Sequence, residues 1–364
     1  MMEKSKDWGG ASIKVIGVGG AGSNAVDRMI QVGIPGVDFI AVNTDAQALE
    51  GSEAACKIQI GERFTRGLGA GGDPATGAEA AKRSRDSLVA AVVGADMVFI
   101  AAGMGGGTGS GAAPVVAKLA RQQGALTIAV VTSPFVFEGS RRRAIAEAAV
   151  KRLEEEVDTL VVVSNDRLLR LVNERVSLDV AFRIADEVLR HGIQGISELV
   201  TQPGLINLDF ADVRAIMDRA GGSLVSIGYG EGEDKAVEAA RMALVSPLLD
   251  VDSVNGTDGL LVNITGGEDL TLTEINEAME MISRAAMPHA QIIFGTVIDP
   301  RMEGRVQITL IATGLGIGKV TRVPPEEGEE GMNLPFNPAS LFSDDLAVPA
   351  FMRSKNKALA SWRV

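Results

Sequence analysis

The sequence predicts an α/β fold in which an N-terminal, Rossmann-like parallel sheet is followed by a long central helix, a smaller C-terminal α/β domain and a disordered tail. Three observations lead to this prediction. In the first half, short and almost wholly apolar runs alternate with stretches of helical spacing, which is typical of parallel strands covered on both faces. One long amphipathic stretch follows, and apolar periodicity stops near residue 316.

The elements of the first half are predicted from β-branched runs and from helical spacing. Strands are expected at residues 13–18, 39–42, 97–101, 126–131 and 160–163. Helices are expected at residues 24–32, 75–93 and 140–156. Gly33 and Pro35 should end the first helix. Because helices separate successive strands, these strands should be parallel.

Residues 177–200 are predicted to form one long helix that connects the two halves. Val180, Ile184 and Val188 share one stripe, and Ser177 is the expected N-cap. Beyond it, helices are expected at residues 210–219, 236–244 and 273–285, and strands at 224–227, 259–265, 291–297 and 306–312. The predicted units are an extension 1–12, domains 13–176 and 204–316 around the central helix 177–203, a linker 317–345 and a terminal peptide 346–364.

The linker and the terminal peptide differ in charge. Residues 324–345 contain six acidic side chains and no basic one, which predicts a disordered segment. Residues 346–364 contain basic and apolar side chains and no acid, as expected of a short docking peptide.

Composition excludes several classes of protein. Lys and Arg number 35 against 47 Asp and Glu, a net charge of −12 that argues against nucleic acid as the main partner. One cysteine and two histidines make a structural zinc site improbable. The first ten residues lack the apolar core of a signal peptide, and no run approaches the ~18 apolar residues of a membrane span. A cytoplasmic location is therefore expected.

Glycine is the most informative residue, with 43 copies beside only 4% aromatics. Residues 17–22 match G-x-G-x-x-G after a strand and before a helix, where helix amides can bind a phosphate. Asp45, after the second strand, is a candidate ribose ligand. These two features together leave open a dinucleotide-dependent oxidoreductase.

A second glycine loop favours a polyphosphate. Residues 103–111 again join a strand to a helix, with Pro114 expected in the first turn of that helix. Backbone amides could surround an anion here, and Thr108 and Ser110 could donate hydroxyl protons. Residues 67–74 supply a third glycine-rich helix start. We expect the three starts to converge on one pocket.

The loop at residues 103–111 resembles the signature loop of the tubulin family in its prokaryotic form, and the order of motifs from about residue 13 to 316 resembles the FtsZ family of bacterial tubulin-like cell-division GTPases. The resemblance implies a GTP/GDP site. Its first loop would comprise Gly20, Ala21, Gly22, Ser23 and Asn24; Gly71 and Gly72 would lie near the γ-phosphate, and Gly107, Thr108 and Gly109 would cradle the phosphates.

The same resemblance assigns the sugar and the base. Residues 134–139 resemble the ribose loop, so Glu138 would bind sugar hydroxyls and Arg142 would lie near the nucleotide. Asn165 and Asp186 would read the guanine edge, with Phe182 against the ring. A carboxylate at position 186 favours GTP over ATP, because guanine presents the N1–H and N2–H donors that it accepts.

For hydrolysis, residues 207–212 match the family pattern N-x-D-x-x-D. In the family this loop acts on the nucleotide of the neighbouring subunit, so Asn207, Asp209 and Asp212 would be catalytic and hydrolysis would require assembly. Two other interpretations remain open. Asp209 could simply cap the helix that follows, with Asp212 favourable in its first turn. The chain could also be a filament protein that binds GTP without hydrolysing it.

The resemblance also implies partners. The protein would polymerise head to tail into the cytokinetic (Z) ring at mid-cell, with Mg²⁺ bound with the nucleotide, no metal ligands from the protein, and K⁺ as a further candidate ion. Residues 346–353, from Leu346 to Arg353, resemble the peptide that binds membrane-tethering and regulatory division proteins, although Ala347 stands where an acid is common. Contact with the membrane would then be indirect.

Overall fold

A computed structural model describes residues 11–169, 177–202, 204–206, 208–218, 221–246 and 257–315. The strands of the first part are β1 (Ile13–Val18), β2 (Val37–Asn43), β3 (Cys56–Gln59), β4 (Met97–Gly103), β5 (Leu126–Ser133) and β6 (Thr159–Ser164). Its helices are α1 (Gly19–Val32), α2 (Ala46–Glu50), α3 (Glu62–Thr65), α4 (Pro74–Arg83), α5 (Arg85–Val92), α6 (Gly107–Gln122), the 3₁₀ turn η1 (Val136–Glu138), α7 (Ser140–Glu154) and α8 (Asn165–Leu169).

The second part begins with the long helix α9 (Leu178–Thr201), which Ser177 caps by accepting a hydrogen bond from the Val180 amide. It continues with α10 (Phe210–Met217), β7 (Gly221–Glu231), α11 (Lys235–Val245), β8 (Gly259–Gly266), α13 (Leu272–Ala285), β9 (Gln291–Ile298), η2 (Pro300–Met302) and β10 (Arg305–Leu315). Among the described residues, no helix combines the length and the apolar character needed to cross a membrane.

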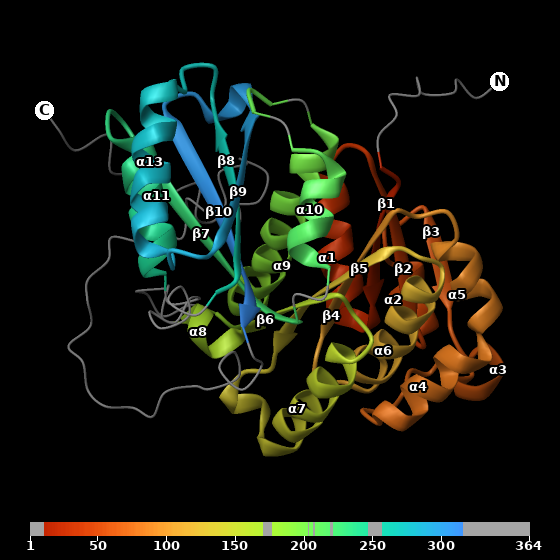
Figure 1. Cartoon of the computed structure of the whole chain (residues 1–364). Coiled ribbons are helices and arrows are strands. Elements are labelled where there is room, and N and C mark those ends of the chain that lie inside the picture. The colour runs from red at the N-terminus through yellow and green to blue at the C-terminus, as the bar shows by residue number, and fades with distance from the viewer. Residues whose placement is uncertain are drawn as a thin grey trace, which may run out of the picture.

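The described strands form one sheet in the order β3-β2-β1-β4-β5-β6-β7-β10-β8-β9. In this order, every neighbouring pair from β3 through β2, β1, β4, β5 and β6 to β7 is parallel. Strand β10 runs antiparallel to both β7 and β8, and β8 pairs in parallel with β9. The sheet passes without interruption from the first half to the second, because Thr159 of β6 is in register with Gly221 of β7. Figure 1 shows α11 and α13 on the outer side of the second group of strands, with α9 between these strands and α1.

The two faces of the sheet have separate cores. Helices α1, α9 and α10 cover one face, where Val15 and Phe99 meet Met29, Ile184 and Val213. The other face is covered by α4 to α7 in the first half and by α11 and α13 in the second. Both faces of the central strands are thus buried, which explains their continuous apolar sequences.

The predicted fold class is confirmed, with local corrections. Helix α1 begins at Gly19 rather than at residue 24, and α6 begins at Gly107, so that Pro114 lies inside the helix and not in its first turn. The single helix expected at residues 75–93 is divided at Ser84, whose hydroxyl accepts the Gly61 amide. Strand β3 and the short helices α2 and α3 were not predicted.

Several predicted units lie outside the described residues. These are residues 1–10 of the N-terminal extension, the linker 317–345 and the terminal peptide 346–364. The limits proposed for the two domains remain predictions.

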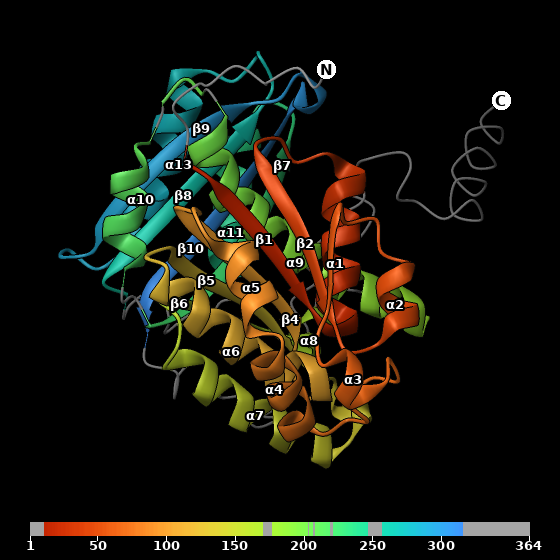
Figure 2. The same cartoon turned by 90° about the vertical axis from the view of Figure 1, so that its right-hand side faces the viewer.

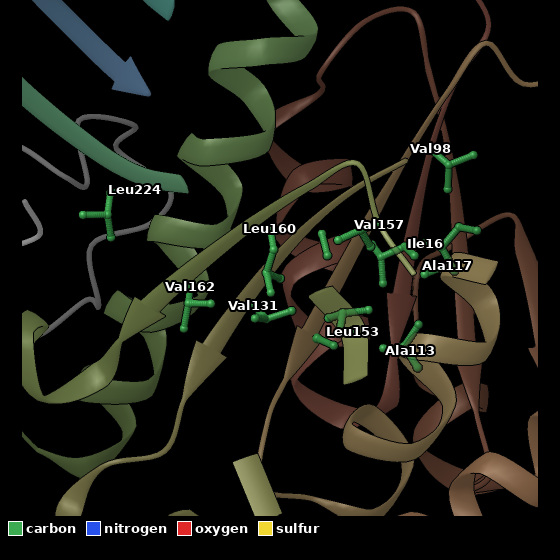
Figure 3. Close-up of a cluster of buried hydrophobic side chains, with 14 of the residues drawn as sticks. Ile16, Val98, Ala113, Ala117, Val131, Leu153, Val157, Leu160, Val162 and Leu224 are labelled. Carbon is green, nitrogen blue, oxygen red and sulfur yellow. The ribbon is translucent and has the colours of Figure 1, made fainter. Parts of the chain in front are cut away.

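Leu160 of β6 tests how much the sheet depends on its packing against α7. Its side chain is fully buried, and Figure 3 shows it beside Val131 of β5 and Leu153 of α7. We expect Leu160→Ala to lower the free energy of unfolding by roughly 2–5 kcal/mol, because the cavity left behind cannot collapse completely. Denaturant unfolding followed by circular dichroism measures this loss.

Leu272→Ala is the matched control, since it makes the same change in a side chain that is 75% exposed. It should change the free energy of unfolding by no more than about 0.5 kcal/mol. Equal losses in the two variants would contradict the packing described for β6.

Candidate functional site

A cavity of about 250 Å³ lies at the carboxyl ends of β1, β4, β5 and β6. Its walls are the first turns of α1 and α6, the segment from Pro134 to Arg142, and the starts of α8 and α9. Ten of the residues predicted to bind nucleotide line it: Gly20, Ala21, Gly107, Thr108, Gly109, Glu138, Arg142, Asn165, Phe182 and Asp186. The cavity therefore occupies the edge of the sheet where α/β proteins usually bind ligands.

Two of the three glycine-rich helix starts open onto the cavity with free amides. The N-cap residues of α1 and α6 are Val18 and Gly106, and neither provides a side-chain hydrogen bond. The first turns of both helices also contain no acidic residue. Such amides, aligned with the helix dipole, attract an anion.

The two loops touch through their backbones. A Cβ atom added to Gly19 would lie 2.9 Å from the Gly109 amide nitrogen, and one added to Gly103 would lie 2.7 Å from the Ala21 Cβ. Gly19 also adopts a φ of +74°, which disfavours other residues. Glycine at these positions allows both sets of amides to face a single ligand.

The third glycine-rich helix start, at residues 67–74, does not line the cavity, and its convergence with the other two stays a prediction. The Asp73 carboxylate accepts hydrogen bonds from the amides of Ala75 and Thr76, so the first turn of α4 is already capped. The Thr76 hydroxyl, together with these amides, lowers the pKa of Asp73, since both stabilise its charged form. Gly71 and Gly72, expected near the γ-phosphate, do not line the cavity.

The two hydroxyl groups of the second loop have different roles. Thr108 lines the cavity, and its hydroxyl oxygen lies 2.6 Å from that of Thr44. Ser110 is fully buried and accepts the Gly105 amide at 2.8 Å. Ser110 does not line the cavity, and its hydroxyl oxygen stabilises the loop, so its predicted donation to a ligand stays a prediction.

A buried carboxylate stands at the other end of the cavity. Asp186 of α9 is only 8% exposed, and the Arg28 Nε of α1 donates to its Oδ2 at 3.3 Å. Burial raises the pKa of Asp186 to about 6, although the charge of Arg28 acts in the opposite direction. Asn165 lines the same region, and its buried Oδ1 has no hydrogen-bond partner. A ligand with hydrogen-bond donors would satisfy both side chains.

An aromatic side chain lies beside these polar groups. Phe182 is 39% exposed and packs edge-on against the buried ring of Phe135, with centroids 5.5 Å apart. Phe135 stacks in turn on Phe137 at 4.9 Å. Phe182 is thereby supported from within while much of its ring stays accessible to a planar ligand.

Glu138 and Arg142 form an ion pair at 2.5 Å along the start of α7. The other Glu138 oxygen accepts the Phe135 amide at 2.8 Å. The Arg142 side chain is 58% exposed, so the pair adds little stability. Both residues can instead reorganise toward a ligand at the mouth of the cavity.

Four further predicted residues lie away from the cavity walls. Gly22 and Ser23 are buried in α1, Asn24 is exposed, and none of the three lines the cavity. Asp45 caps α2 by accepting the Ala48 amide, and it also does not line the cavity. The interpretation of Asp45 as a ribose ligand is therefore not supported.

Sequence reasoning missed some lining residues. Among these are Thr132 at the end of β5 and Ala185 of α9. Thr132 could have been found from the rule that ligands bind where parallel strands end. Ala185 adjoins Asp186 in sequence, but small apolar side chains carry no chemical signal.

The acidic pair Asp209 and Asp212 lies at the opposite edge of the sheet. Both side chains are exposed on α10, and Arg214 of this helix donates to the carbonyl of Gly124, which stands just before β5. Asp209 occupies the N-cap position but makes no capping hydrogen bond with its side chain. Figures 1 and 2 both place α10 far from the start of α7. Asn207 lies outside the described residues.

Two family models match the chain in succession. Residues 12–173 match the GTPase domain of the Tubulin/FtsZ family. Residues 221–316 match the C-terminal domain of the FtsZ family.

Solved structures agree with these matches. An empty FtsZ dimer from M. jannaschii is 47% identical, with a TM-score of 0.81 over 86% of this chain and 89% of that one. A mutant FtsZ from M. jannaschii is 48% identical, with a TM-score of 0.82 over 84% and 92%. The GTPγS-bound protofilament of CetZ2 from Haloferax volcanii shares the fold, with a TM-score of 0.69 at 24% identity over 83% and 92% of the two chains.

Both uncapped helix starts and most of the cavity wall thus lie within the residues that match the GTPase domain, while Phe182, Ala185 and Asp186 of α9 lie beyond them. The strands from β7 onward lie within the residues that match the C-terminal domain. The chain belongs to the Tubulin/FtsZ family.

Proposed function

We propose that this protein is a GTPase that polymerises head to tail, and that each active site is completed by the next subunit. The observation that carries the proposal is the separation within one chain of the cavity, at the carboxyl edge of the sheet, from Asp209 and Asp212 at the amino edge. A contact that joins one edge to the other is heterologous, and repeated without closure it builds an open filament. The similar structures include an FtsZ dimer and a CetZ2 protofilament, which supports self-association here.

The base end of the cavity fits guanine. The buried carboxylate of Asp186 can accept two hydrogen bonds from N1–H and N2–H. The free Asn165 Oδ1 is a further acceptor, and Phe182 offers a surface for the ring. Adenine presents no such pair of adjacent donors, so the site should prefer GTP to ATP.

The phosphate end fits a polyphosphate held mainly by backbone amides. The uncapped starts of α1 and α6 would bind the phosphate oxygens, with Thr108 as a hydroxyl donor. Among the described residues, no three His, Cys, Asp or Glu side chains are grouped as metal ligands. Mg²⁺ commonly takes few protein ligands, so it would be held mainly by the phosphates and would neutralise charge that develops during hydrolysis. K⁺ remains a candidate without an assigned site.

Asp209 and Asp212 would position and polarise the attacking water from the neighbouring subunit, with Asn207 beside them. Both carboxylates are exposed, and the absence of a capping bond leaves the Asp209 side chain available for this role. On this account the C-terminal domain activates the GTPase domain of the next subunit.

The cellular role follows from the family resemblance. We propose that the filaments form the cytokinetic (Z) ring in the cytoplasm at mid-cell, as in septation. Residues 346–353 would bind membrane-tethering and regulatory division proteins, and the acidic linker would separate this peptide from the filament. Nucleic acid is not an expected partner, and contact with the membrane would be indirect.

Replacing Asp186 should expose its role in reading the base. We expect Asp186→Asn to bind GTP roughly 10- to 100-fold more weakly, since a hydrogen bond to a charged group is lost. In the wild-type protein, affinity should fall as the pH drops through about 6, because the raised pKa of Asp186 places its protonation there. Titration calorimetry between pH 5 and 8 measures both effects.

The Asn variant also serves as the control for the titration of the nucleotide phosphates. The ratio of wild-type to variant affinity should decline below about pH 6, where the wild-type carboxylate gains a proton. A ratio that does not change with pH would remove Asp186 from base recognition.

Replacing Asp212 should separate binding from turnover. We expect Asp212→Ala to retain GTP affinity within about twofold while phosphate release falls by roughly 10²- to 10⁴-fold, as for loss of a proton-transfer group. Asp218→Ala, which removes another exposed acid at the far end of α10, should retain turnover.

If Asp212→Ala and Asp218→Ala hydrolyse GTP equally well, Asp212 is an ordinary acid of the first helical turn. If the wild-type protein itself assembles with GTP but releases no phosphate, the chain is a filament protein that does not hydrolyse its nucleotide.

A further inference from the structure

Thr44 is a buried hydroxyl residue that reaches the cavity only through another side chain. It follows β2 directly, is fully buried and does not line the cavity. Its Oγ1 lies 2.6 Å from the Oγ1 of Thr108, which does line the cavity in the first turn of α6. Thr44 therefore interacts with the phosphate end of the cavity through Thr108.

The hydroxyls of Thr44 and Thr108 have one proton each, and one of these two protons forms the hydrogen bond between them. Each hydroxyl can donate one proton and accept two. If Thr108 donates to Thr44, it has no proton left for a ligand. If Thr44 donates to Thr108, the Thr108 proton is available to the cavity. A fully ionised phosphate oxygen only accepts hydrogen bonds, so a bound phosphate selects the second arrangement.

The backbone of Thr44 is held by α3 and by the loop that follows α3. Its carbonyl accepts the Thr65 hydroxyl at 3.3 Å and the Gly69 amide at 3.4 Å. The carbonyl oxygen of Gly61 lies 3.2 Å from the same hydroxyl and shares its single proton. These contacts hold the Thr44 backbone against α3 and the loop after it, which limits the positions that its hydroxyl can take.

We propose that Thr44 is a positioning residue for the phosphate end of the cavity: its hydroxyl donates to Thr108 and thereby directs the Thr108 proton toward a bound phosphate. The inference rests on the proposed role of the cavity as a GTP site. It assigns a function to a residue that does not line the cavity, and it explains why a fully buried position carries a hydroxyl rather than an isosteric apolar side chain.

Thr44→Val tests the proposal, because it preserves the shape of the side chain and removes only the donor. We expect its GTP affinity, measured by titration calorimetry, to be about tenfold lower than that of the wild type. Thr44→Ser keeps the hydroxyl and should bind GTP within about twofold of the wild type. Equal losses in the Val and Ser variants would overturn the proposal, and so would an unchanged affinity in the Val variant.

A double-mutant cycle distinguishes positioning from a general weakening of the fold. Thr44→Val should cause little further loss in a Thr108→Val background, because the hydroxyl that it orients is absent. In an Asp186→Asn background, Thr44→Val should lower the GTP affinity by the same factor as in the wild type, because Asp186 lies at the base end of the cavity. Equal losses in both backgrounds would assign Thr44 to the general stability of the site and overturn the proposal.

Two measurements keep the proposal testable if Thr44→Val does not fold. Thr44→Ala and Thr44→Ser differ only by the hydroxyl oxygen and can replace the Val and Ser comparison. Thr108→Val alone must also lose affinity, so an unchanged value would overturn the inference without any Thr44 variant. A wild-type protein that binds no GTP would instead overturn the proposed function.

Discussion

The constraint on which the structure depends is direct backbone contact at the carboxyl edge of the parallel strands. A Cβ atom on Gly22 would lie 2.2 Å from the Ala101 carbonyl oxygen, one on Gly109 would lie 2.5 Å from that of Gly103, and one on Gly111 would lie 2.1 Å from that of Pro74. Larger residues at these positions would separate α1 and α6 from the strands, and α6 from α4. Because the contacts are preserved, the uncapped amides of α1 and α6 face one cavity.

Charge is distributed along the site in a way that follows from this packing. The phosphate end presents amides, while the base end presents the Asp186 carboxylate, which α1 holds through Arg28. The exposed acids of α10 lie beyond the opposite edge of the sheet. Within a single chain, Asp209 and Asp212 therefore lie away from the cavity, and under the proposed function a second copy would bring them to it.

Much of this arrangement can be predicted from the sequence, because strands buried on both faces are continuous apolar runs and α9 is strongly amphipathic. The first residues of α1 are harder to predict, because glycine disfavours a helix. Residues 19–22 are helical in the folded protein, where Gly19 and Gly22 pack closely against the backbones of Gly109 and Ala101. The sequence could not show that Asp73 caps α4, or that Ser110 bonds to its own loop. Both depend on side-chain orientation within the folded loops.

The measurement that tests the shared active site most directly is phosphate release from a mixture of Asp212→Ala and Asp186→Ala, with light scattering followed in the same samples. GTP is kept too dilute to fill the Asp186→Ala cavity, so each variant alone should be nearly inactive. In an equal mixture, about one quarter of heterologous contacts would pair an intact cavity with an intact acidic loop. Recovery of phosphate release in proportion to these complete contacts would support the shared active site. A mixture that assembles but hydrolyses no more GTP than the separate variants would contradict it.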